Sequence, residues 1–149
     1  MEILRQQFLR HIGQTSPSPM LVEVARAEGV CFFTPEGKRY YDIIAGVSVS
    51  NVGHGNPAVT EAVCRQARDY MHVMVYGELV ERPQVRYAAR IAEYLPVPLD
   101  AVYFVNSGAE AVEGAIKAAR KYAYLKDGCT DHEIIAMNHS FHGRTMGAL

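Results

Sequence analysis

The stretch that decides the fold is VYFVNSGAEAVEGAIKAAR, residues 102–120. Apolar and aromatic residues with strand character run directly into Asn106-Ser107-Gly108, and a helical pattern begins without a further loop. The apolar stripe of that helix, expected over about residues 109–126, consists of Val112, Ile116, Ala119 and Ala123. A strand that runs straight into a helix is typical of an α/β fold.

The corner between strand and helix has the chemistry of an anion site. The start of a helix carries unpaired N–H groups and the positive end of the helix dipole. Gly108 lets a ligand approach the backbone closely, and Ser107 offers a hydroxyl, so the corner predicts a phosphate site. The alternative is that Asn106 or Ser107 only caps the helix. The sequence here matches neither a Walker A loop nor GxGxxG.

A second strand, EIIAM at 133–137, leads into the loop NHSFHGRT at 138–145. Two apolar strands separated by a long helix indicate a right-handed βαβ unit in a parallel sheet. Parallel strands would bring both loops to one edge of the sheet, one with an anion nest and the other with an aromatic face and a cation. Within the helix, Glu113 and Lys117 are spaced to pair across one turn.

The remaining elements follow from periodicity and from proline and glycine positions. They are a helix over 2–12, a linker at 16–19, an antiparallel meander within 21–44, a glycine-rich segment at 44–55, and helices over 57–71 and 83–95. Asn56 and Pro57 form a good helix start. The glycine-rich segment suits backbone packed against a ligand or another chain. The sequence predicts two domains, residues 1–50 and 51–149.

Composition excludes several classes of protein. The 149 residues are 49% hydrophobic and 21% charged with a net charge of −1, as in a globular protein. No basic block indicates nucleic-acid binding, and the charged N-terminus is neither a signal peptide nor a membrane span. Cys31, Cys64 and Cys129 are odd in number and widely spaced, which favours reduced thiols in a cytoplasmic protein. The apolar, helix-like final ten residues suggest one part of a longer protein.

Three motifs, in order along the chain, resemble the class III aminotransferases, which are fold-type I enzymes that use pyridoxal 5′-phosphate (PLP). They are YYDIIAGVSVSNVGHGNPAV, FVNSGAEAVEGAIKAAR and SFHGRTMGAL, and the resemblance spans about residues 20–149. It implies an α/β fold in which an N-terminal small-domain segment is followed by the first part of the parallel-sheet large domain.

The resemblance also implies cofactor-binding residues. Ser107, Gly108 and the backbone of Ala109 match the turn that binds the PLP phosphate. Relatives often carry a hydroxyl at the third position, so Ala109 can contribute only its N–H. Phe141 matches the aromatic residue that stacks on the pyridine ring, with a core residue as the alternative. His142 matches a residue beside the cofactor.

Three further residues are implied as substrate contacts. Arg144 matches the arginine that receives a substrate carboxylate in the acetylornithine and ornithine branches; a surface or structural ion pair is the alternative. Val47 lies where the ornithine branch carries an aromatic pocket residue. Tyr76 lies in a stretch that in relatives approaches the partner subunit's active site, and a packed interface tyrosine is the alternative.

The implied reaction is transfer of an amino group from an ω-amino acid or an N-acyl diamino acid to 2-oxoglutarate, in a homodimer. The Schiff-base lysine and the carboxylate on the pyridine nitrogen are expected downstream of Leu149. No catalytic residue is therefore assigned within the chain, which is expected to be inactive alone. Solvated positions are expected for the helix lysines, Lys117, Lys121 and Lys126.

Other functions fit less of the sequence. A glutamate-1-semialdehyde aminomutase and a non-catalytic truncated module are the alternatives. A zinc site would need Cys129-x-x-His132 and His139-x-x-His142, but the strand between the two pairs would separate them, so no metal is expected. A cysteine hydrolase would need a thiol at a helix N-terminus, which neither Cys31, mid-strand, nor Cys64, mid-helix, provides.

Overall fold

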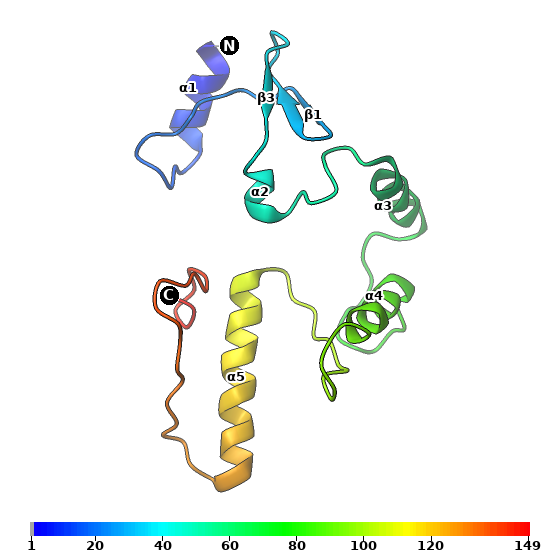
Figure 1. Ribbon diagram of the computed structural model, residues 1–149, viewed down its shortest axis with the longest axis vertical. Helices are drawn as coiled ribbons and strands as arrows, with labels where there is room; N and C mark the ends of the chain where they lie inside the picture. Colours follow the sequence, from blue (N-terminus) through cyan, green and yellow to red (C-terminus); the bar gives the residue numbers. More distant parts are fainter. Residues whose placement is uncertain (1) are drawn as a thin grey trace. The chain divides into compact units, whose positions relative to one another are not determined.

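The computed structural model describes residues 2–149 and divides into two compact units, one ending at Val75 and one beginning at Tyr76 (Figure 1). The sequence predicts a division into domains at residue 50. The compactness of these two units does not test it, and it stays a prediction.

The first unit contains a helix, a small sheet and two further helical segments. In chain order they are α1 (Glu2–His11), β1 (Arg26–Glu28), β2 (Cys31–Phe33), β3 (Arg39–Tyr41), α2 (Ala45–Ser48) and α3 (Pro57–Asp69). The strands form an antiparallel sheet in the order β1-β2-β3, which confirms the predicted meander. Phe32 and Tyr40 are cross-strand partners, and their rings stack with centroids 5.2 Å apart.

The start of α3 confirms the predicted helix signal. The side chain of Asn56 accepts hydrogen bonds from the N–H groups of Ala58 and Val59, at 3.0 and 3.4 Å, and Pro57 occupies the first helical position. Two orphan donors of the first turn are thereby satisfied, and proline costs nothing where its missing N–H would have been unpaired.

The glycine-rich segment contains a left-handed turn at α2. All four residues of α2 have positive φ, 48° at Ala45, 62° at Gly46, 61° at Val47 and 64° at Ser48. This conformation costs roughly 1–2 kcal/mol for each residue other than glycine. The chain therefore needs contacts on both sides of the turn to hold it.

Those contacts come from Asp42 and from a backbone bridge. The Ala45 N–H donates to Asp42 Oδ1 at 2.9 Å, and His54 Nε2 lies 2.7 Å from Asp42 Oδ2. His54 and Gly29 exchange two backbone hydrogen bonds, and Gly53 lies so close that an added Cβ would stand 3.1 Å from the Gly29 oxygen. The close backbone packing expected against a ligand or another chain is made here to the same chain.

The second unit contains α4 (Arg82–Ala92) and α5 (Gly108–Asp127), close to the two helices predicted there. The predicted strands at 101–105 and 133–137 are wrong as paired strands. Within residues 2–149 the only ladder is β1-β2-β3, so the predicted βαβ pairing is not formed. A strand needs a hydrogen-bonded neighbour along at least one edge, and no backbone hydrogen bond joins these two segments.

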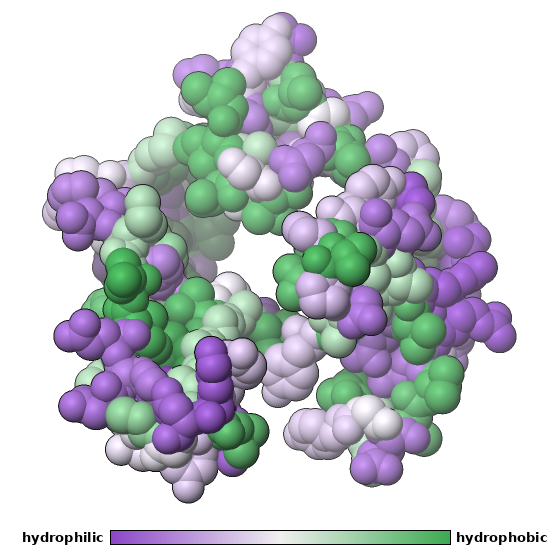
Figure 2. All heavy atoms as spheres, turned by 60° about the horizontal axis from the view of Figure 1, so that its bottom comes forward, coloured by the Kyte–Doolittle hydropathy of each residue, from purple (hydrophilic) through white to green (hydrophobic). Residues whose placement is uncertain are grey.

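Neither unit closes around a large core. The 16.5 kDa chain exposes 13263 Å², whereas two separate compact domains of half this mass would together expose about 9,100 Å². Within residues 2–149 the buried side chains are few, with Cys31, Thr34 and Ala148 among them. Apolar side chains are accordingly spread over the visible surface (Figure 2). No helix among these residues combines the length and apolar character needed to cross a bilayer.

Asp42 should make the conformation of α2 dependent on pH. The hydrogen bond from His54, followed by that from the Ala45 N–H, lowers the pKa of Asp42 below its ordinary value of 3.8. The contact therefore stabilises the turn above that value and is lost as the pH falls through the lower, folded pKa. In an NMR titration of the full chain, the Ala45 amide proton should shift with a midpoint below 3.8.

The matched variant is Asp42→Asn, which keeps an acceptor for Ala45 but has no group that titrates in this range. Its Ala45 signal should stay constant through the same titration. A midpoint at or above 3.8 in the unsubstituted chain would show that Asp42 does not hold the turn.

Candidate active site

The N-terminus of α5 is a capped helix start with free donors. Ser107 is extended (φ −150°, ψ 161°), and its Oγ accepts a hydrogen bond from the Glu110 N–H at 3.2 Å. Glu110 in turn accepts from the Asn106 N–H at 2.7 Å. The capping residue is thus Ser107 rather than Asn106. The N–H groups of Gly108 and Ala109, in the first helical turn, have no acceptor inside the helix and remain for a ligand.

The loop after residue 138 lies against this helix start (Figure 1). An added Cβ on Gly143 would stand 2.6 Å from Ala109 Cβ, closer than real carbon atoms approach, and a tight 3.1 Å from Ala148 Cβ. The φ of Gly143 is +137°, which also requires glycine. The structure thus brings together the Ser107 corner and the loop at 140–145, as the sequence predicts, although by packing rather than by paired strands.

Glu113 fastens the same loop. Its Oε1 accepts hydrogen bonds from Thr145 Oγ1 at 2.6 Å and from the Gly147 N–H at 2.9 Å. The hydrogen bond from Thr145, followed by that from Gly147, lowers the pKa of Glu113 below its ordinary value of 4.5. Lys117 contributes only a minor part, and no ion pair joins it to Glu113 among the described residues. The predicted pair across one turn is replaced by contacts to the loop.

The three residues predicted from this loop lie on either side of Gly143, the residue that packs on the helix start. Phe141 is 79% exposed, and the guanidinium of Arg144 lies 5.9 Å from its ring centroid, within reach of a cation–π interaction. His142 is half-buried, and its Nε2 is enclosed without a hydrogen-bond partner. A buried nitrogen of this kind is rare and calls for a polar partner.

The other two predicted pocket residues, Val47 and Tyr76, lie outside the loop at 140–145 and are exposed. Val47 lies on the left-handed turn of the first unit and is 83% exposed, and Tyr76 lies in the loop before α4 and is 87% exposed. Within residues 2–149 the Tyr76 hydroxyl forms no hydrogen bond and its ring stacks on no other. The roles of all the predicted site residues stay predictions at this point.

The sequence reasoning missed the contacts of Glu113, Thr145 and Gly147. Glu113 and Gly147 are 34 positions apart, so no local pattern links them. The only sequence feature that pointed to this contact was Gly147, a second glycine in a loop expected to lie close to the helix. An added Cβ on Gly147 would stand 2.6 Å from Glu113 Oε2, so a larger residue there would displace the Glu113 carboxylate.

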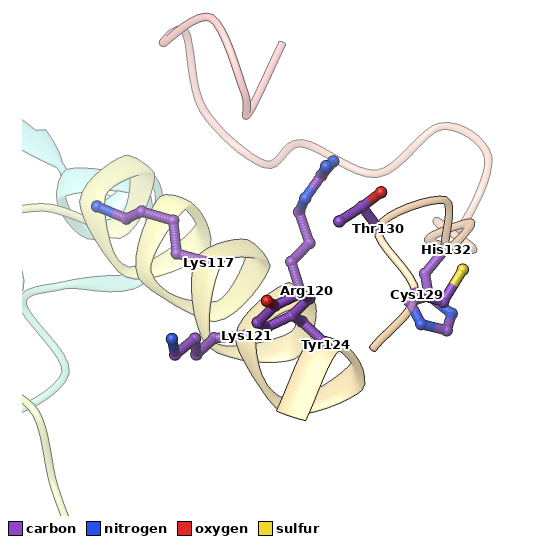
Figure 3. Close-up of a pocket in the computed structure, with 7 residues that line it drawn as sticks. All are labelled: Lys117, Arg120, Lys121, Tyr124, Cys129, Thr130 and His132. Carbon is purple, nitrogen blue, oxygen red and sulfur yellow. The ribbon is translucent and has the colours of Figure 1, made fainter. Parts of the chain in front are cut away.

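A separate cavity of about 300 Å³ lies along the later turns of α5 (Figure 3). It is lined by Lys117, Arg120, Lys121, Tyr124, Cys129, Thr130 and His132. Arg120 extends toward Thr130, whereas the ammonium ends of the two lysines point elsewhere. Lys121 lies over the ring of Tyr124, 5.7 Å from its centroid. The cations do not converge, so this cavity does not form an anion site.

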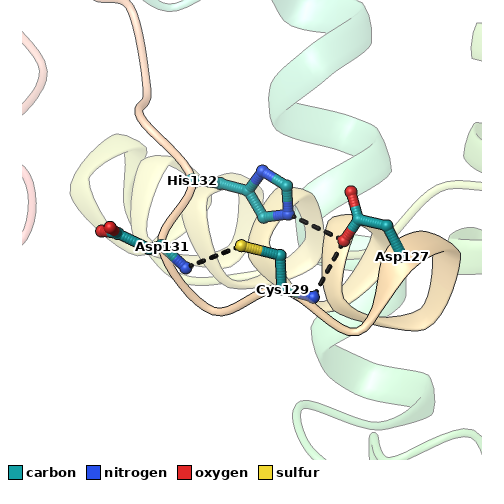
Figure 4. Close-up of polar contacts among 4 residues, drawn as sticks. All are labelled: Asp127, Cys129, Asp131 and His132. Carbon is teal, nitrogen blue, oxygen red and sulfur yellow. Dashed lines mark hydrogen bonds and ion pairs between the residues drawn. The ribbon is translucent and has the colours of Figure 1, made fainter.

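Cys129 and His132, the first pair of the zinc alternative, lie in the turn after α5 and contact Asp127 (Figure 4). The Cys129 N–H donates to Asp127 Oδ1 at 2.9 Å, and His132 Nε2 lies 3.1 Å from the same oxygen. The thiol sulfur accepts from the Asp131 N–H at 3.4 Å. No group of three or more histidine, cysteine or acidic side chains suited to a metal is found in the part of the chain that the structure describes.

Comparison with known proteins identifies the family. The family model for aminotransferase class III matches residues 12–149. An acetylornithine aminotransferase from Gloeobacter violaceus is 40% identical over 98% of this chain and 35% of its own length. The chain thus spans about a third of the length of the curated relatives it matches.

Solved structures agree with the sequence comparison. A thermostable (S)-enantioselective ω-transaminase from Thermomicrobium roseum has a TM-score of 0.86 at 35% identity, covering 99% of this chain and 34% of the other. An ornithine aminotransferase from Toxoplasma gondii, described with partial occupancy of PLP at its active site, has a TM-score of 0.82 at 31% identity, again covering 99% and 34%. These matches confirm the fold-type I class, with this chain corresponding to about a third of each enzyme. The chain belongs to the class III aminotransferase family.

Proposed function

We propose that this chain supplies the phosphate- and ring-binding part of a PLP-dependent aminotransferase. The observation that carries the proposal is the packing of Gly143 on Ala109, because it joins the donors of the α5 N-terminus to the loop with Phe141, His142 and Arg144. The N–H donors suit the phosphate group of a phosphorylated pyridine, and the aromatic side chain of the loop suits its ring.

The residues present fit that cofactor. The free N–H groups of Gly108 and Ala109 would bind the phosphate. The Ser107 hydroxyl, whose oxygen already accepts from Glu110, still has its proton to donate to it. Phe141 would cover the ring, and the unpartnered His142 Nε2 would find a polar group on the cofactor or its bound water. When bound, PLP supplies an electron sink for the amino group's α-carbon.

We propose that Arg144 binds a carboxylate of the substrate. Within residues 2–149 no acidic side chain forms an ion pair with Arg144, which weakens the alternative of a structural ion pair. The guanidinium fork matches a carboxylate. Relatives named acetylornithine and ornithine aminotransferase favour an ω-amino acid or N-acyl diamino acid as donor, and 2-oxoglutarate as acceptor is part of the same proposal.

We also propose that the complete enzyme is a cytoplasmic homodimer, and that these 149 residues do not catalyse the reaction alone. The exposed apolar side chains of the glycine-rich segment, such as Ile44, Val47 and Val49, support a partner surface in the first unit. The lysines on α5 support the proposal that the chain alone is inactive. Lys117 and Lys121 line the separate cavity along the later turns of α5 and not the candidate cofactor site.

Cofactor binding can be tested with a fluorescent variant of the full chain. The chain has no tryptophan, so Phe141→Trp introduces a single reporter that keeps an aromatic face. Pyridoxamine 5′-phosphate, which has no aldehyde to condense with surface lysines, should quench this fluorescence to saturation. Pyridoxamine without phosphate should need about 10- to 100-fold higher concentration, because it lacks the charge-assisted hydrogen bonds to the α5 N-terminus.

The control reporter is Tyr122→Trp, on an exposed face of α5. It should respond little to either compound. Equal quenching of both reporters, or equal potency of the two compounds, would contradict a site formed by the helix start and Phe141.

Arg144 can be tested in the complete enzyme by its donor dependence. Arg144→Lys keeps the charge but loses the bidentate fork, so kcat/KM for donors with a carboxylate should fall about 10- to 100-fold. For a simple primary amine without a carboxylate it should change little. Arg120→Lys, on the later part of α5, serves as the control. A uniform loss across donors would remove Arg144 from the substrate pocket.

A further inference from the structure

One face of α5 contacts the candidate cofactor loop, residues 138–149, at two positions. Ala109 and Glu113 are four residues apart, so they lie one above the other on the helix. Ala109 meets Gly143, and Glu113 accepts hydrogen bonds from Thr145 Oγ1 and the Gly147 N–H. The loop is therefore held on both sides of Arg144, the residue between the two contacts.

Glu113 provides the only hydrogen bonds that tie this loop to the rest of the described chain. Across residues 138–149, the remaining recorded hydrogen bond runs from the Ala148 N–H to the Thr145 oxygen and is internal to the loop. The contact of Gly143 with Ala109 is close packing without a hydrogen bond. Packing of two small residues alone leaves the loop free to slide or lift, whereas a carboxylate that accepts two donors fixes its direction.

We propose that Glu113 is a positioning residue, which orients the loop of Phe141, His142 and Arg144 against the N-terminus of α5 through Thr145 and Gly147. This inference rests on the proposed function, since it names what holds the ring-binding side of that site in place. Glu113 itself touches neither the phosphate donors nor the aromatic ring. It acts through the loop, so its loss should affect ring binding and leave phosphate binding intact.

The carboxylate is the group that matters, and two substitutions of Glu113 and two of Thr145 separate its properties. Glu113→Ala removes both acceptors while favouring the helix, so α5 stays formed. Glu113→Gln keeps an acceptor oxygen and removes the charge, and should give an intermediate effect. On the loop side, Thr145→Ser keeps the donor hydroxyl and should behave as the unsubstituted chain, whereas Thr145→Val should resemble a partial loss of the contact.

The test uses amide NMR of the full chain with two probes, inorganic phosphate and pyridoxamine 5′-phosphate. The shifts of Gly108 and Ala109 give both affinities. In Glu113→Ala the affinity for pyridoxamine 5′-phosphate should fall about tenfold while that for phosphate changes less than about twofold. Glu61→Ala on α3, the same exchange at an exposed helix position, should change neither. A general loss of structure would lower both affinities together, and that result would overturn the inference.

Hydrogen exchange of the Gly147 amide provides a readout that does not depend on any ligand. It should become much faster in Glu113→Ala and stay slow in Thr145→Ser. If the unsubstituted chain binds neither probe, the proposed function fails, while Gly147 still reports whether Glu113 holds the loop. Unchanged exchange of Gly147 in Glu113→Ala would overturn the inference whatever the probes do.

Discussion

The candidate site depends on the contact between the first turns of α5 and the turn at residues 143–148. Gly143 approaches Ala109 so closely that a side chain at Gly143 would clash with it, and Glu113 adds two hydrogen bonds beside them. A helix start by itself is a common feature with no specificity, and so is an exposed phenylalanine in a loop. In the proposed function, the two together would offer hydrogen-bond donors for an anion and an aromatic face for a ring.

The local part of this arrangement could be predicted from sequence. Capping residues act within one helical turn, so Asn56-Pro57 and Ser107-Gly108 are readable without knowledge of the fold. The meander was equally readable, because aromatic and β-branched runs were broken at glycines. The order of three motifs also identified the family, which the family model then confirmed over residues 12–149.

The rest depended on contacts that are distant in sequence. Nothing near Glu113 in the chain indicates Thr145 or Gly147, and the obvious local partner, Lys117, forms no ion pair with it. The left-handed turn at 45–48 is also unreadable, since Val47 is β-branched and strongly disfavours positive φ. The strand predictions at 101–105 and 133–137 failed for a related reason. An apolar pattern indicates that burial of a segment is favourable, but it does not identify the strand with which the segment pairs.

The exposed apolar side chains of the two segments predicted as strands agree with their lack of pairing. Tyr103, Ile135 and Met137, from the two unpaired segments, are all exposed. Parallel strands are normally covered on both faces and read as continuous apolar runs, as these segments do. The helix start and its partner loop nevertheless hold their relative position through Ala109, Glu113 and Gly143. The geometry of the candidate site is therefore set by a small, local contact rather than by a closed core.

The most direct test of this account is a nuclear Overhauser measurement on the isotope-labelled full chain, between the methyl group of Ala109 and the α-protons of Gly143. The account predicts a strong cross-peak, because these atoms are in van der Waals contact. Its absence, with both signals assigned and α5 shown to be helical, would mean that the loop does not lie on the helix start, and the proposed site would be contradicted.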